Sequence, residues 1–114
     1  MLSLYFELSE FLDALTDWHI EFMKVAKKYY HADMILWHDD MGSQRVPFFS
    51  PELFREIYLP YYRRITKACH DEGMFIALHS CGNVGLHIEN FAVLLTIIQH
   101  DCFKLQSEEM NACF

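Results

Sequence analysis

The pattern of apolar positions opens with a run of three- and four-residue steps between Leu8 and Tyr29. Steps of this size put side chains on one face of a helix, so they predict a long amphipathic helix from about Glu7 to Tyr30. We expect its aromatic stripe to be core and not a cofactor site. The stripe consists of Leu8, Phe11, Leu12, Leu15, Trp18, Phe22, Val25, Ala26 and Tyr29.

A short apolar run, Ala32 to Trp37, is bounded by charge and predicts a buried parallel strand. The segment Ser50-Pro51-Glu52 predicts a helix start, with serine as N-cap, proline at the first helical position and an acid in the first turn. This helix is expected to end at Gly73, and Pro60 is expected to kink or break it.

Two further strands and a third helix complete the pattern. Met74 to His79 predicts a strand, His87 to about Ile98 a helix, and Cys102 to Gln106 a last strand. Strands that alternate with helices of this length predict an α/β fold with a parallel sheet and crossover helices.

Polar residues follow both of the first two predicted strands, namely His38-Asp39-Asp40 and His79-Ser80-Cys81. Chemistry at the carboxyl ends of strands is typical of (β/α)8 barrels and doubly wound sheets. A (β/α)8 TIM barrel needs about 250 residues. We therefore expect residues 1–114 to form a single partial barrel segment, about three of the eight βα units.

In such a segment the inward side chains would have no opposite wall, and we assign Ile35, Trp37, Ile76 and Leu78 to this face. Leaving them in water would cost roughly 1.5–3 kcal/mol each. We therefore expect the isolated chain to form a homo-oligomer and to be catalytically inactive by itself.

The formal net charge of −7 argues against a nucleic-acid surface, which needs clustered lysine and arginine. No apolar run approaches the ~20 residues of a membrane span, and no basic segment precedes the first apolar residues as in a signal peptide. Cysteines 69, 81, 102 and 113 lack the spacing of a disulfide framework. We therefore expect reduced thiols and a cytoplasmic protein.

His79 and Cys81 are two positions apart on a predicted strand, so both should project to the same face. Imidazole and thiolate are preferred zinc ligands, and Gly82 lets the backbone turn away directly after them. The alternative is a buried thiol beside a hydrogen-bonded histidine.

The neighbouring polar residues also have two interpretations. Asp39 and Asp40 could be catalytic, because adjacent carboxylates at a strand end raise each other's pKa and bind polar substrate groups or a metal's outer shell. Alternatively, one carboxylate caps the loop and the other is solvated. His38 and Gln106 are candidate substrate-binding residues, against a packing role for His38.

The stretch from Asp33 to Gly82 resembles the uroporphyrinogen decarboxylase superfamily, which also contains the corrinoid- and thiol-dependent methyltransferases. Trp37–Gly42 is similar to the family's strand-end loop. Phe49–Phe54, followed by Leu59-Pro60, is similar to its Ser-Pro helix. His79–Gly82 resembles the zinc-binding strand end of the methyltransferase branch.

This resemblance implies that zinc holds a small-molecule thiol as a thiolate, which takes a methyl group from a methylated corrinoid protein. His79 and Cys81 would be two of three protein ligands. The family's remaining cysteine lies beyond this chain, and Cys102 or Cys113 could imitate it. The resemblance also favours Asp39 as the carboxylate that faces the substrate cavity, near His79 and Cys81.

Two alternatives remain at this point. One is decarboxylation of uroporphyrinogen in tetrapyrrole synthesis, which needs no metal. The other is a non-catalytic remnant or oligomerising module. Metal content would separate the methyltransferase from both alternatives, and porphyrinogen binding would separate the alternatives from each other.

Overall fold

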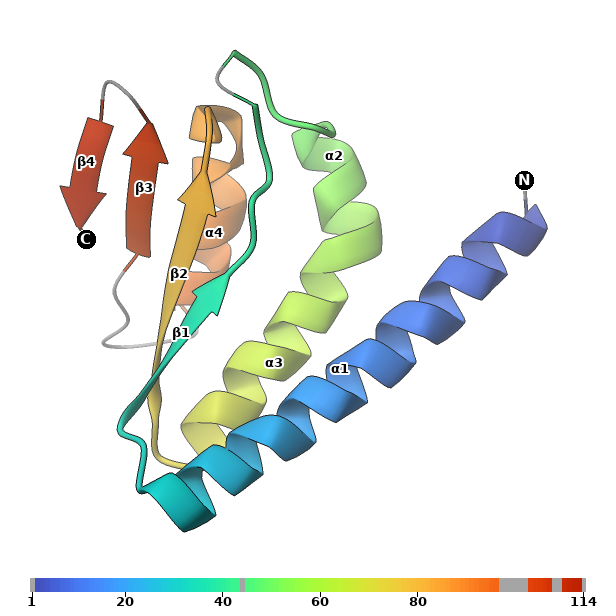
Figure 1. Cartoon of the computed structure of the whole chain (residues 1–114). Helices are drawn as coiled ribbons and strands as arrows, with labels where there is room; N and C mark the ends of the chain where they lie inside the picture. The colour runs from blue at the N-terminus through green and yellow to red at the C-terminus, as the bar shows by residue number, and fades with distance from the viewer. Residues whose placement is uncertain (1, 44, 97–102, 108–109, 114) are drawn as a thin grey trace.

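The computed structural model describes residues 2–43, 45–96, 103–107 and 110–113, with side chains described except at 2, 81, 95–96, 103–107 and 110–113. Helices and strands alternate along the chain (Figure 1). The elements are α1 (Leu2–Tyr30), β1 (Met34–His38), α2 (Pro51–Leu53), a π-helical segment (Phe54–Tyr58), α3 (Leu59–Asp71), β2 (Phe75–Cys81), a 3-10 turn (Gly85–His87), α4 (Ile88–Thr96), β3 (Phe103–Ser107) and β4 (Met110–Cys113).

The four strands form one sheet in the order β1-β2-β3-β4. β1 pairs with β2 and β2 pairs with β3 in parallel, which confirms the predicted α/β fold with crossover helices. β4 is antiparallel to β3 and was not predicted. Ser107 pairs with Met110, a separation far too short for the crossover that a parallel strand requires.

The helix between the first two strands follows its predicted signals. The Ser50 hydroxyl accepts a hydrogen bond from the Leu53 N–H at 3.1 Å, as an N-cap does. Pro60 follows the π-helical segment, in which the Leu59 N–H bonds to the Phe54 carbonyl, so the predicted irregularity is confirmed. Gly73 ends the helix with a φ of 75°.

Two apolar clusters hold the helices against the sheet. The cluster near the carboxyl ends of the strands joins the π-helical segment, α3 and α4, and consists of Met41, Phe54, Leu59, Val84, Phe91 and Leu94. The second cluster joins α1 and α3 to the sheet, and consists of Met23, Ile65, Cys69, Met74 and Ile76.

The prediction of which side chains lie on the bare face of the sheet is wrong by one position along each strand. Ile35 and Trp37 pack against the cluster that contains Ile76, and Leu78 packs against the other cluster, so all four face the helices. The exposed face carries the alternate residues Met34, Leu36 and Phe75 instead. Side chains alternate along a strand, so a shift of one position exchanges the two faces completely.

The expectation that the aromatic stripe of α1 is core is also wrong. Trp18 is 61% exposed, and Phe11 and Phe22 are exposed as well. The helix buries Thr16 and Met23, which lie on the adjacent face toward α3. Figure 1 shows α1 beside α3, with its N-terminal end far from the sheet. Within the described part of the chain, no helix is long and apolar enough to cross a membrane.

Candidate functional site

The carboxyl ends of β1 and β2 bring two histidines together. His38 pairs in register with His79, so both side chains lie on the same face of the sheet. Their ring centroids are 4.7 Å apart and their planes are tilted by 37°. The sequence predicted a metal role for His79 and a substrate-binding role for His38, and the fold makes the two rings neighbours.

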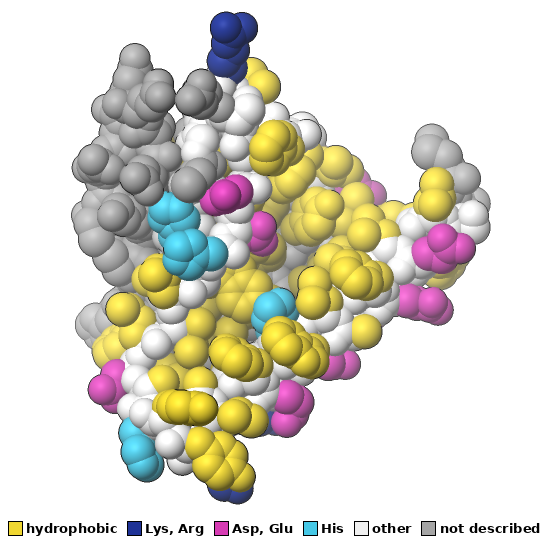
Figure 2. Space-filling view, viewed as in Figure 1, with side chains coloured by type: hydrophobic (Ala, Val, Ile, Leu, Met, Phe, Trp, Pro, Cys, Tyr) yellow, Lys and Arg dark blue, Asp and Glu magenta, His cyan; other side chains and the backbone are white. Residues whose placement is uncertain are grey.

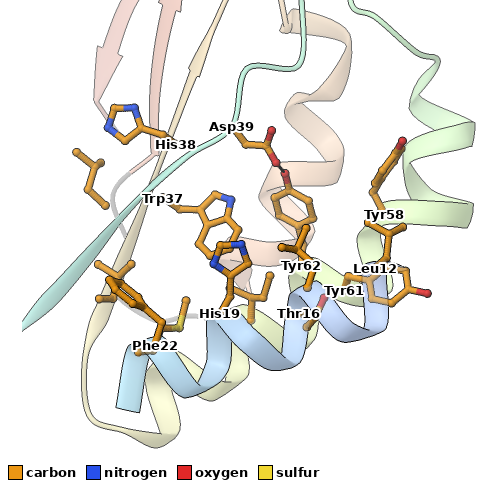
Figure 3. Close-up of a pocket in the computed structure, with 15 residues that line it drawn as sticks. Leu12, Thr16, His19, Phe22, Trp37, His38, Asp39, Tyr58, Tyr61 and Tyr62 are labelled. Carbon is orange, nitrogen blue, oxygen red and sulfur yellow. Dashed lines mark hydrogen bonds between the residues drawn. The ribbon is translucent and has the colours of Figure 1, made fainter. Parts of the chain in front are cut away.

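Asp39 lies on the opposite face from these histidines. Its backbone N–H donates to the His79 carbonyl at 3.0 Å, which ties the two strand ends together. Its carboxylate accepts a hydrogen bond from the Tyr62 hydroxyl of α3. Figure 3 shows this bond on the helix side of β1, with His38 pointing to the other side. Asp39 is therefore near His79 through its backbone, but its carboxylate does not share the histidine face.

The Asp39–Tyr62 contact keeps the phenol protonated. Burial raises the pKa of Tyr62 well above its ordinary value, and the negative charge of Asp39 together with the hydrogen bond raises it further. A phenol in this state is a permanent donor at neutral pH. The contact therefore fixes Asp39 as an acceptor that points toward α3.

A cleft of about 450 Å³ lies between α1, β1 and α3. Figure 2 shows it as a hollow lined mainly by apolar side chains. His19 of α1 packs edge-on against Trp37, with ring centroids 4.6 Å apart (Figure 3). Burial lowers the pKa of His19, and the charge of Asp39 opposes this shift. Within the described residues, the buried Nε1 of Trp37 has no hydrogen-bond partner.

The loops after β1 and β2 are bonded to each other. Ser80 is fully buried, and its hydroxyl accepts from the Met41 N–H at 3.1 Å. The Asn83 N–H donates to the Ser43 carbonyl at 2.7 Å. A Cβ at Gly82, where φ is 87°, would lie 2.2 Å from the Gly42 carbonyl oxygen. The strand ends can approach this closely only because residue 82 is glycine.

The other predicted site residues are Asp40, Cys81 and Gln106. Asp40 is exposed after β1. Cys81 ends β2 and pairs in register with Gln106 of β3, but the side chains of both lie outside the described residues. Cys102 and the side chain of Cys113 also lie outside them. Among the residues that are described, no group of three His, Cys, Asp or Glu side chains could hold a metal ion.

Residues 1–108 match the family model described as uroporphyrinogen decarboxylase (URO-D). The chain belongs to the uroporphyrinogen decarboxylase family. The predicted resemblance to this family is thereby confirmed. Comparison with curated proteins and with solved structures gives no match.

For this uroporphyrinogen decarboxylase family member, sequence reasoning missed the residues on the helix side of the site. Tyr62 and His19 each lie within a predicted helix, and neither belongs to a recognisable catalytic or metal-binding motif. No sequence signal connects either residue to Asp39. Only the packing of α1 and α3 on β1 brings them to one cleft.

Proposed function

We propose that this chain acts, within a (β/α)8 enzyme of the uroporphyrinogen decarboxylase family, in zinc-dependent methyl transfer from a methylated corrinoid protein to a small-molecule thiol. The observation that supports this proposal is the pairing of His38 and His79 at the carboxyl ends of two parallel strands. Cys81 follows two positions after His79 in the same strand. Such strand ends are where (β/α)8 enzymes carry their chemistry.

The donor set fits zinc in part. A catalytic zinc site has three protein ligands and one open position, and nitrogen and sulfur ligands suit it. We assign His79 and Cys81 as ligands, and His38, whose ring centroid lies 4.7 Å from that of His79, is a further nitrogen donor. When bound, zinc would lower the pKa of a substrate thiol and keep it as a nucleophilic thiolate.

The residues around the histidines have supporting roles in this proposal. Ser80, through its bond to the Met41 N–H, fixes the loop after β1 against β2. Asp39 and Asp40 provide carboxylates on and near the strand end, and Asp39 is oriented by Tyr62. Gln106, which pairs in register with Cys81, is the proposed substrate-binding residue of β3. A zinc-thiolate chemistry is suited to the cytoplasm, where thiols remain reduced.

The test is the zinc stoichiometry of the purified chain, measured by elemental analysis after dialysis. We expect bound zinc in the wild type and a sharp loss in His79→Ala and in Cys81→Ser, because a hydroxyl is a poorer zinc ligand than a thiolate. Cys69→Ala is the matched control, because this buried cysteine lies in the cluster between α3 and the sheet. If no variant changes the zinc content, the ligand assignment is wrong.

The family description favours a second candidate function, the decarboxylation of uroporphyrinogen without a metal. The carboxylates of Asp39 and Asp40 at the end of β1 are the groups that would act on a pyrrole ring. A zinc-free chain that binds a porphyrinogen, and loses this binding in Asp39→Asn or Asp40→Asn, would support it. A chain that binds neither zinc nor porphyrinogen would be a non-catalytic module.

A further inference from the structure

The cleft between α1, β1 and α3 is walled by aromatic rings. Its volume of about 450 Å³ lies within the roughly 300–1,000 Å³ that is usual for small-molecule sites. The aromatic members of the lining are His19, Phe22, Trp37, Tyr58, Tyr61 and Tyr62. They come from all three elements, and Figure 3 shows them around one hollow, with Asp39 above the rings.

The rings on the two sides of β1 lie close enough to act on one ligand. Trp37 is in edge contact with His19, and its ring centroid lies 6.3 Å from that of Tyr62, at an angle of 66° between the planes. Trp37 and the three tyrosines of α3 and the preceding segment are only partly buried, so part of each ring is open to the cleft. The face of an aromatic ring is negative and attracts cations.

The charges around the cleft favour the same kind of ligand. In the part of the chain that is described, Asp39 is the only Asp or Glu that lines the cleft, and no lysine or arginine does. Burial lowers the pKa of His19, so its ring is uncharged at neutral pH and does not repel a cation. The net charge of −7 adds a negative field. The cleft is therefore suited to a positive ligand.

We propose that this cleft binds a quaternary ammonium cation, with its methyl groups on the ring faces and its charge near Asp39. A primary ammonium group is strongly hydrated, and each of its N–H groups needs an acceptor when it leaves water. Here the Asp39 carboxylate already accepts from Tyr62, and ring faces are weak acceptors. A methylated cation carries the charge without N–H groups, so it suits this lining better.

This site is separate from the proposed zinc site. The rings of His38 and His79 are paired on the other face of the sheet, and Figure 3 shows His38 pointing away from the aromatic wall. The cation can therefore be tested on the metal-free chain, without thiol or porphyrinogen. The result does not depend on whether the proposed activity is correct.

The first test compares three small molecules by fluorescence titration. Trp18→Phe provides the background, because Trp37 is then the only tryptophan. Choline is the probe, 3,3-dimethylbutan-1-ol has its shape without the charge, and ethanolamine has the charge without the methyl groups. We expect choline to bind at least about tenfold more tightly than either. Equal binding of choline and one of the others, or no saturable binding of choline, overturns the proposal.

The second test removes the carboxylate. Asp39→Asn should reduce the preference for choline over the uncharged alcohol to about threefold or less. Asp33→Asn is the matched control, because Asp33 is exposed at the start of β1 and lies outside the lining. This control should keep the preference of the unaltered chain. A preference that Asp39→Asn does not change, or that Asp33→Asn reduces equally, overturns the role of Asp39.

The third test separates the ring of Tyr58 from its hydroxyl. Tyr58→Leu should weaken choline binding by about three- to tenfold, whereas Tyr58→Phe keeps the ring face and should bind as the unaltered chain does. An equal loss in both variants would mean that the hydroxyl binds the ligand, and it would overturn the cation–ring contact. Saturation-transfer NMR on the choline methyl protons checks the ranking of the three compounds on the unaltered chain, so the proposal is decided even if a variant does not fold.

Discussion

The imidazole rings of His38 and His79 lie side by side on one face of the sheet, with their centroids 4.7 Å apart. Their contact results from the register of β1 and β2, in which the two residues are direct partners. Asp39, the next residue along β1, bonds to Tyr62 on the other face. His38 and Asp39, which are adjacent in the sequence, therefore lie on opposite faces of the sheet.

This division predicts unequal effects on metal binding. We expect His38→Ala to weaken zinc affinity by about 10- to 100-fold, the range for a group that supports or completes a ligand set. Asp39→Asn should leave the affinity unchanged, because its carboxylate points toward α3. Competitive titration with a chromogenic chelator measures both. Equal losses in the two variants would contradict the assignment of His38 to the metal face.

The hydrogen bond from Tyr62 to Asp39 should be a measurable part of the stability. We expect Tyr62→Phe to lower the free energy of unfolding by about 1.5–3 kcal/mol, because the bond is to a charged acceptor. Tyr61→Phe is the control, since its hydroxyl donates to the neutral Ser9 carbonyl at 3.3 Å. The Tyr61→Phe variant should lower the free energy of unfolding by only about 0.5–1.5 kcal/mol. Urea unfolding compares the two, and a larger loss in the control would refute the expectation.

Stability should fall at mildly acidic pH because of two histidines, the buried His87 and the half-buried His19. Burial lowers the pKa of both His19 and His87. The Nε2 of His87 donates to the Phe49 carbonyl at 3.1 Å, and its buried Nδ1 has no partner among the described groups. The unfolded chain therefore takes up more protons as the pH falls below about 6.5, and folding loses stability.

Urea unfolding at a series of pH values checks this sign. His87→Gln should reduce the loss of stability on acidification, because an amide can still donate to Phe49 but does not titrate. His31→Asn, at an exposed position, is the control and should keep the wild-type slope. A slope that His87→Gln does not change would mean that other groups cause the acid sensitivity.

The close approach of the two strand-end loops should make Gly82 irreplaceable. Gly82 and Gly73 both have a positive φ, of 87° and 75°. A Cβ at residue 82 meets the Gly42 backbone, whereas a Cβ at residue 73 has no atom within 4 Å. We expect Gly73→Ala to cost about 1–2 kcal/mol, the strain of the left-handed conformation alone. Gly82→Ala should cost several times as much in the same unfolding measurement, and similar losses would contradict the loop contact.

Much of the fold could be predicted because its signals are local. Ser50, Pro60 and Gly73 act through the backbone within one turn, so the start, irregularity and end of the second helix follow from the sequence alone. The alternation of helices and strands likewise predicted the parallel pairing of β1 and β2. The motifs of the strand ends were enough to indicate the uroporphyrinogen decarboxylase family.

What the tertiary structure alone decided is which face each side chain occupies. Ile35 and Trp37 were predicted on the bare face but lie under the helices. The alternation of side chains along a strand shows which residues share a face, but it does not show which face the helices cover. The stripe of α1 satisfies the helical period, but its burial depends on where α3 packs, and α3 takes the neighbouring face. Asp39 meets Tyr62 for the same reason. Local chemistry sets the elements of this chain, and non-local packing assigns their faces.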